Sequence, residues 1–150
     1  MNIRIVLSAL LAMCLFGACT NNDRCDALNQ ETRIQDYIEK NNLVTQKTAS
    51  GLHYIIEEEG SQIRPIETSI VKVIYTGRLT DGSIFDQTDT GIEFSLGSVI
   101  AGWTEGIQLF KKGGKGTLIV PCTLGYGEQN RTGIPPASVL IFDIELVDVR

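Results

Sequence analysis

The stretch Ser69–Leu79 reads SIVKVIYTGRL. β-Branched and aromatic residues fill most of it, and such residues are enriched in strands. The basic residues Lys72 and Arg78 lie an even number of positions apart, as alternation along a strand with one solvated face requires. The stretch therefore predicts a strand of an antiparallel sheet, because antiparallel sheets commonly keep one face in water.

The segments around this strand have a similar texture and are broken by glycine or proline. Four further runs rich in Ile, Val, Tyr and Thr predict strands: Leu52–Glu57, Ile92–Leu96, Gly116–Val120 and Leu140–Val149. Ala101–Phe110 predicts one short helix, with Trp103 and Ile107 on one side and a cationic, glycine-rich segment after it. One short helix covered by an antiparallel sheet is an α+β arrangement.

An N-terminal helical extension is predicted before this domain. Asp26–Asn41 reads DALNQETRIQDYIEKN, and its apolar residues recur at roughly helical spacing: Leu28, Ile34, Tyr37 and Ile38. Asn29 and Thr32 are the candidate caps near its start. The narrow apolar stripe favours packing against the main domain, and the alternative is a weak homodimer through this helix. Thr45–Ser50 is polar and without periodicity, which predicts a linker.

The first eighteen residues differ in kind from the rest. Arg4 precedes Ile5–Ala18, an uncharged apolar run too short to span a bilayer comfortably, so the segment reads as a secretory signal. Small residues then precede Cys19, which resembles a bacterial lipoprotein cleavage site with Cys19 as the lipidated residue. An ordinary signal peptide cut near Ala18 is the alternative. We expect an exported protein with a lipid anchor to a membrane, facing the periplasm or the cell exterior.

Charge and cysteine usage narrow the partners. The net charge is -5, and loss of Arg4 with the signal leaves 12 basic against 18 acidic groups, a net of -6, so nucleic acid is not an expected partner. Cys14 leaves with the signal and Cys19 takes lipid, so Cys25 and Cys122 remain. The sequence does not decide whether these two pair, although two free thiols, with Cys122 buried at a strand end, are slightly favoured.

Common catalytic arrangements are absent from the sequence. His53 is the only histidine, which excludes a hydrolytic triad with histidine and a multi-histidine metal site, and we expect it to be partly exposed and structural. Lys112–Gly116 lacks the spacing of a P-loop or a Rossmann motif. Asp86 has no second carboxylate or histidine beside it in its motif, which favours a fixed hydrogen-bonding role over acid-base catalysis.

Aromatic residues carry the strongest functional signal. The chain has only 10 of them, and six fall beside glycine, proline or a single carboxylate. Together with their neighbours they form an ordered series: Tyr75-Thr76-Gly77, Asp81-Gly82, Phe85-Asp86, Phe94, Val99-Ile100, Gly102-Trp103, Tyr126-Gly127, Ile134-Pro135-Pro136 and Phe142. In this order and spacing, over roughly residues 69–149, the series resembles the FKBP-type peptidyl-prolyl cis-trans isomerases.

The resemblance implies a twisted antiparallel sheet half-wrapped around one short helix, with an apolar pocket between them. It implies walls and a rim made by the catalytic residues Tyr75, Phe85, Asp86, Ile100, Trp103, Tyr126 and Phe142 and by the substrate-binding residues Phe94, Val99 and Ile134, with Trp103 as the floor and Asp86 at the rim. The backbone N–H of Ile100 and the phenol of Tyr126 resemble the family's donors to the substrate carbonyl. The sequence then divides into a lipoprotein signal peptide at 1–18, a tether and helix at 19–44, and an FKBP-type isomerase domain at 45–150.

The implied reaction needs no cofactor or metal. Rotation of an X-Pro bond crosses a barrier of about 20 kcal/mol because it destroys amide resonance, yet no bond is made or broken. The expected partners are proline-containing polypeptides and macrolide inhibitors of the tacrolimus type. The alternative function is a catalytically weak peptide-binding module or holdase chaperone that uses the same pocket.

Overall fold

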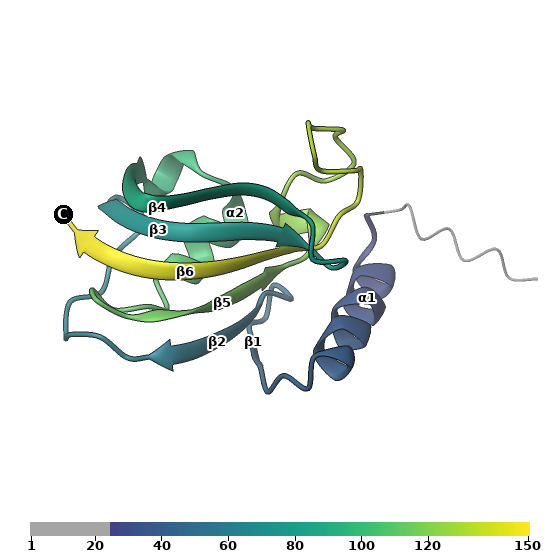
Figure 1. Ribbon diagram of the computed structural model, residues 1–150, viewed down its shortest axis with the longest axis horizontal. Helices are drawn as coiled ribbons and strands as arrows, with labels where there is room; N and C mark the ends of the chain where they lie inside the picture. The colour runs from purple at the N-terminus through teal and green to yellow at the C-terminus, as the bar shows by residue number, and fades with distance from the viewer. Residues whose placement is uncertain (1–24) are drawn as a thin grey trace, which may run out of the picture.

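The computed structural model describes residues 25–150 (Figure 1). The predicted signal peptide at 1–18 and the predicted lipidation site Cys19 lie outside these residues. Within them, no helix is long and apolar enough to cross a membrane. The element order is α1, β1, β2, β3, β4, α2, β5 and β6, with one 3-10 turn before α2 and another after β5.

The strands form one six-stranded sheet in which every neighbouring pair is antiparallel, so the predicted α+β class is confirmed. The spatial order is β1-β2-β5-β6-β3-β4. The strand bounds are β1 Gln46–Lys47, β2 His53–Glu58, β3 Ile70–Leu79, β4 Ile84–Ser95, β5 Lys115–Val120 and β6 Leu140–Val149. β1 lies inside the segment that the sequence predicted as a linker.

β4 is longer than its sequence indicates. The predicted strand was Ile92–Leu96, but the observed one begins at Ile84. β4 is an edge strand, and its pairing with β3 contains two register shifts, one between Val73 and Tyr75. Much of an edge strand is solvated, and bulges interrupt alternation, so its middle carries polar residues without a clear two-residue period.

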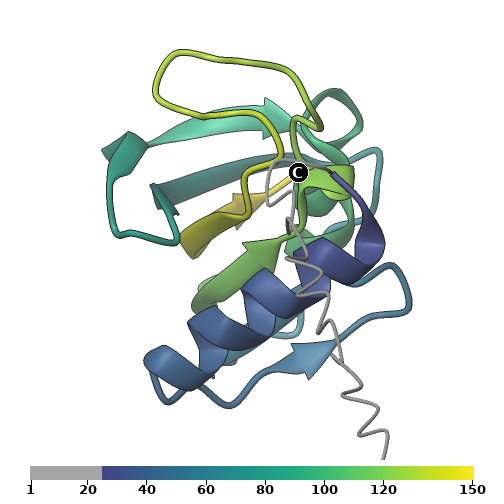
Figure 2. The ribbon, with the colours of Figure 1, turned by 90° about the vertical axis from the view of Figure 1, so that its right-hand side faces the viewer.

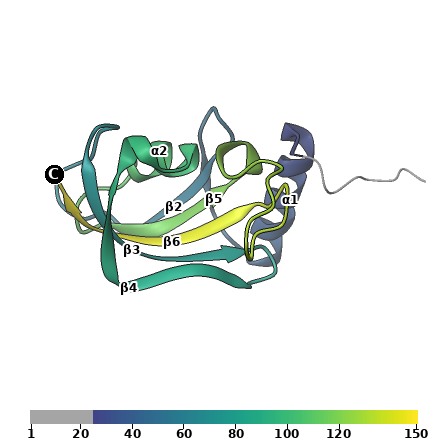
Figure 3. The same cartoon turned by 90° about the horizontal axis from the view of Figure 1, so that it is seen from above.

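Helix α2, Ala101–Ile107, packs on one face of the sheet, which curves around it (Figure 3). It is shorter than predicted, although Phe110 in the following turn is still buried with Ile107 and Trp103 in the main core. A Cβ on Gly102 would lie 2.4 Å from Val120, and one on Gly106 would lie 2.5 Å from Leu118. The two glycines therefore let the helix approach β5 closely.

Helix α1, Ala27–Lys40, lies across the end of the sheet on its other face (Figure 2). Alternation along β5 and β6 places Ile119 and Ile141 on this face, where Ile34 of α1 packs against them and Val139. The prediction that the helix packs against its own domain is confirmed. Its N-cap is Asp26, which accepts from the Asn29 N–H, so the predicted caps were wrong.

Two predictions about residues beneath α1 were also wrong. Cys25 and Cys122 are not free thiols but form a disulfide across 97 residues, because docking of α1 brings the residue before its N-cap to the buried turn after β5. His53 is only 3% exposed rather than partly exposed, because α1 covers the start of β2. Neither contact is encoded locally, since both depend on where α1 docks.

Candidate active site

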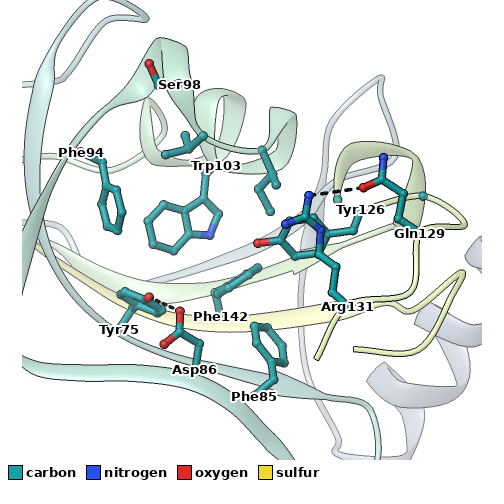
Figure 4. A pocket seen from close by; sticks show the side chains of 14 residues that line it. Tyr75, Phe85, Asp86, Phe94, Ser98, Trp103, Tyr126, Gln129, Arg131 and Phe142 are labelled. Atoms are coloured by element: carbon teal, nitrogen blue, oxygen red, sulfur yellow. Dashed lines mark hydrogen bonds between the residues drawn. The ribbon is translucent and has the colours of Figure 1, made fainter. Parts of the chain in front are cut away.

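A cavity of about 720 Å³ opens between α2, the sheet and the segment after β5 (Figure 4). Its size lies in the range of small-ligand sites. Aromatic and aliphatic side chains from β3, β4, β6, α2 and the segment before α2 line one part of it, and the segment after β5 lines the rest. The lining residues are Tyr75, Phe85, Asp86, Phe94, Ser98, Val99, Ile100, Trp103, Gly125, Tyr126, Gly127, Gln129, Arg131 and Phe142.

Trp103 forms the floor and is the centre of an aromatic cluster. Its ring centroid lies 4.9 Å from that of Tyr75, 5.3 Å from that of Phe94 and 5.3 Å from that of Phe142, all close to edge-to-face. Each such pair contributes about 0.5–1.5 kcal/mol beyond the area it buries. The floor is therefore rigid as well as apolar.

The glycine that follows Tyr75-Thr76 in β3, Gly77, lies where two rings of the cavity wall approach the backbone. A Cβ at this position would lie 2.6 Å from the Phe85 ring and 3.1 Å from the Phe142 ring. These two rings meet edge-to-face at 5.6 Å above the glycine backbone. The absent side chain thus leaves the space in which one wall of the cavity is built.

Asp86 sits at the rim and is tied to the wall. The Tyr75 hydroxyl donates to the Asp86 carboxylate at 2.5 Å. Burial and this hydrogen bond raise the pKa of Tyr75 well above its ordinary value, so the phenol stays protonated and remains the donor. The Asp86 carboxylate is therefore held by a hydrogen bond, and its role in the site stays a prediction.

The donors beside the cavity that are unused within residues 25–150 include the buried indole N–H of Trp103 and two donors from Ile100 and Tyr126. The backbone N–H of Ile100, the residue before α2, donates to no acceptor there, although its carbonyl accepts from the N–H groups of Trp103 and Thr104. The hydroxyl of Tyr126, a half-buried residue, likewise makes no hydrogen bond in this part of the chain, while the Tyr126 ring is covered by Arg131. Both residues line the cavity, so both donors are available to a bound carbonyl.

The family model described as FKBP-type peptidyl-prolyl cis-trans isomerase matches residues 61–147. The chain belongs to this family. A probable FKBP-type peptidyl-prolyl cis-trans isomerase of Haemophilus influenzae is 51% identical over 107 residues, which are 69% of this chain and 44% of the relative. FkpA of Escherichia coli is 41% identical over 130 residues, which are 83% of this chain and 48% of that protein.

Solved FKBP-type structures agree with the fold. The crystal structure of FkpA from Escherichia coli superposes with a TM-score of 0.74 at 41% identity, covering 83% of this chain and 61% of that one. A peptidyl-prolyl cis-trans isomerase from Pseudomonas syringae gives 0.71 at 31% identity, covering 83% of this chain and 96% of that one. The chain spans less than half the length of the curated relatives named above.

The FKBP-type cavity contains nine of the ten pocket residues that the sequence predicted. Ile134 is the exception: it is buried in the main core and does not line the cavity. Five lining residues were not named as site residues from the sequence, although Gly127 stood in the quoted series: Ser98, Gly125, Gly127, Gln129 and Arg131. Three of these lie directly beside predicted ones, whereas Gln129 and Arg131 lie in a polar loop that gave no local signal.

The arrangement suits noncovalent chemistry. The Asp86 carboxylate and the Tyr75 phenol are hydrogen-bonded to each other, and the remaining titratable groups of the lining are the Tyr126 phenol and a guanidinium. Among these groups, no nucleophile lies next to a base. Within residues 25–150, no three His, Cys, Asp or Glu side chains are grouped so as to hold a metal ion. The cavity offers an apolar floor and donors at its edge, which can desolvate and orient a bound group.

Proposed function

We propose that this protein is a peptidyl-prolyl cis-trans isomerase that accelerates X-Pro bond rotation in exported polypeptides. One observation carries the proposal: the hydrogen-bond donors Ile100 N–H and Tyr126 O–H lie beside an aromatic cavity and have no acceptor among residues 25–150. Membership of the FKBP-type family supports it. The polypeptide need only lose water around one imide and be held while that imide twists.

Desolvation supplies the first part of the catalysis. A planar amide is stabilised by charge separation between nitrogen and oxygen, and the twisted transition state has less of it. An apolar site such as the one around Trp103 therefore penalises the planar ground state more than the twisted state. A reduction of the barrier by about 5 kcal/mol would accelerate rotation several thousandfold.

Orientation supplies the second part. In the proposed complex the proline ring lies on Trp103, and the preceding carbonyl accepts from Ile100 N–H or Tyr126 O–H. A donor fixed before the substrate arrives costs no reorganisation during the reaction. On the β3–β4 side of the cavity, Tyr75 and Asp86 hold each other through a hydrogen bond.

The test measures isomerisation of a Leu-Pro tetrapeptide by the purified protein. We expect acceleration over the uncatalysed rate, and a loss in kcat/KM of about two- to tenfold for Tyr126→Phe, because one neutral hydrogen bond contributes about 0.5–1.5 kcal/mol. Tyr54→Phe is the matched control: it removes a phenol that donates to Gln46 outside the cavity, and its kcat/KM should match the wild type.

An absent acceleration would reject the isomerase. If the same protein still bound the peptide and suppressed aggregation of an unfolded client, the peptide-binding module or holdase would take its place. We also propose a tacrolimus-type macrolide as an inhibitor that competes with the peptide for this cavity, whose volume lies in the range of small-ligand sites.

The proposed protein is an exported lipoprotein held on a membrane by lipid on Cys19, with residues 1–18 removed as the signal. The disulfide between Cys25 and Cys122 supports an oxidising compartment. We expect Cys19→Ser to move the protein from the membrane to the soluble fraction of cells. Unchanged membrane association in that fractionation would reject the anchor.

We propose a monomer as the main form of the protein. The apolar stripe of α1 buries Ile34 against its own sheet, so this residue is not available to a partner helix. Sedimentation of the protein at several concentrations would test this, and mass growing with concentration would favour the weak homodimer.

A further inference from the structure

Arg131 lies at the mouth of the cavity. Its guanidinium carbon is 4.3 Å from the centroid of the Tyr126 ring, within the range of a cation–π contact. Figure 4 shows the side chain lying over Tyr126, whose phenol is one of the two proposed carbonyl donors. A charge here is therefore next to the group that a substrate would use.

The position of this guanidinium is fixed by several contacts. The backbone of Arg131 exchanges two hydrogen bonds with Ile134, at 3.1 and 2.9 Å, which close a tight turn. The guanidinium also donates to the Gln129 side chain at 3.3 Å. The turn, the contact with the Tyr126 ring and the hydrogen bond to the Gln129 side chain together hold the guanidinium at the mouth before any ligand binds.

Arg131 has no carboxylate partner among residues 25–150. Arg78 and Arg150 in the same part of the chain pair with Asp143 and Glu93, respectively. The acid nearest to Arg131 in sequence, Glu128, instead accepts from the backbone N–H of Cys25 on the α1 side of the loop. The charge of Arg131 is thus left for a ligand.

The cavity also carries a negative charge, at a different place from Arg131. Asp86 comes from β4 and lies beside Tyr75 in Figure 4, whereas Arg131 lies beside Tyr126, and the Asp86 carboxylate accepts from the Tyr75 hydroxyl. A bound peptide would meet a cation and an anion at separate places. An acidic side chain is attracted at the Arg131 side, while a basic one would be attracted only at the Asp86 side.

We propose that Arg131 is a specificity-determining residue that selects polypeptides with an acidic residue immediately beside the proline. The proposal rests on the proposed isomerase function and names the substrate class of that site. A carboxylate beside the bound proline would meet the planar guanidinium, whose paired N–H groups match it in shape.

The experiment compares Glu with Gln beside proline, because the two side chains differ in charge and hardly in size. Two tetrapeptide pairs place the variable residue before or after proline, and kcat/KM is measured for each. We expect one pair to show a preference for Glu of about two- to fivefold in the wild type, the range for an exposed ion pair. The preference should shrink in 0.5 M NaCl.

Variants assign the preference to one side chain. Arg131→Gln should abolish it, Arg131→Glu should reverse it, and Arg131→Lys should retain part of it. Arg150→Gln removes the same charge from an arginine outside the cavity and should leave the preference as in the wild type.

The same measurements distinguish a failure of the charge selectivity from a failure of the isomerase proposal. Equal kcat/KM for Glu and Gln in both pairs, or a preference for Glu that survives Arg131→Gln, would overturn the selectivity. If no peptide is isomerised, the isomerase proposal fails, and the affinities of the same peptides, measured by Trp103 fluorescence, then decide the charge preference. Affinities that do not distinguish Glu from Gln would overturn it there as well.

Discussion

His53 is a single buried side chain that joins three elements. Its Nδ1 lies 3.0 Å from the Thr45 hydroxyl, and its Nε2 lies 3.7 Å from the Glu31 carboxylate of α1, which also binds Lys47 of β1 at 2.6 Å. Nε2 has no hydrogen bond in the described part of the chain. Burial lowers the pKa of His53 below its ordinary value of 6.5, although Glu31 opposes the shift.

This lowered pKa makes folding stability depend on pH. Below pH 6.5 the unfolded chain takes up a proton at His53 that the folded chain refuses, so stability is full above 6.5 and is lost as the pH falls towards the folded pKa. We expect the Tm to fall between pH 7.5 and 5.5, and to fall less in His53→Gln. An equal fall in both proteins would assign the dependence to another group.

Protonation of the Glu31 carboxylate does not interfere with this measurement. The pKa of Glu31 is lowered by its bond to Lys47, so its contribution to stability is present above its ordinary value of 4.5 and is lost only below that. The chosen window ends above 4.5. Thermal melts monitored by circular dichroism at the two pH values are therefore sufficient.

At the scale of elements, α1 holds the loop that carries the polar side of the cavity. The buried Gln30 amide accepts from Cys122 N–H at 2.9 Å and donates to the Ala137 carbonyl at 3.0 Å. These two residues bracket the segment that carries Tyr126 and Arg131. The disulfide from Cys25 adds a covalent link at the same end of the segment.

Removing the disulfide should cost much of the stability. Cys25→Ser frees a loop of about a hundred residues in the unfolded chain, which lowers the free energy of unfolding by about 2–4 kcal/mol. Urea unfolding of both proteins measures the difference. Dithiothreitol should bring the wild type down to the variant and leave the variant unchanged, and a wild type indifferent to dithiothreitol would show that the disulfide contributes nothing.

Whether a feature was predicted from the sequence depends on whether its signal lies in the sequence pattern or only in contacts of the folded chain. Helical period within one segment marked α1, and the order and spacing of short motifs over residues 69–149 marked the pocket aromatics. The cap at Asp26 lay just before the apolar pattern and was missed, and two thirds of β4 was missed because an edge strand needs no alternation. The disulfide depends on α1 docking, and Arg131 reaches the cavity only through its turn with Ile134.

At the scale of the molecule, one helix packs on each face of the sheet, and the two helices have different roles. α2 covers the face that contains the cavity, whereas α1 covers the end of the other face and does not line the cavity. Two neighbouring residues of β6 point to opposite faces of the sheet: Phe142 faces the cavity and Ile141 faces α1. β6 and the loop are therefore the parts of the structure that join the residues beneath α1 to the site.

The division of the chain at residue 45 can be tested on this basis. In residues 45–150 alone, Ile119, Val139 and Ile141 lose their cover, and the link from Cys25 is lost as well. We expect this fragment to unfold at lower urea than the protein and to bind more hydrophobic dye. Ile34→Ala separates the two losses: it keeps the disulfide and should cost about 2–5 kcal/mol, the range for a truncated core side chain. A fragment as stable as the protein would show that α1 is an appendage and that the domain is complete from residue 45.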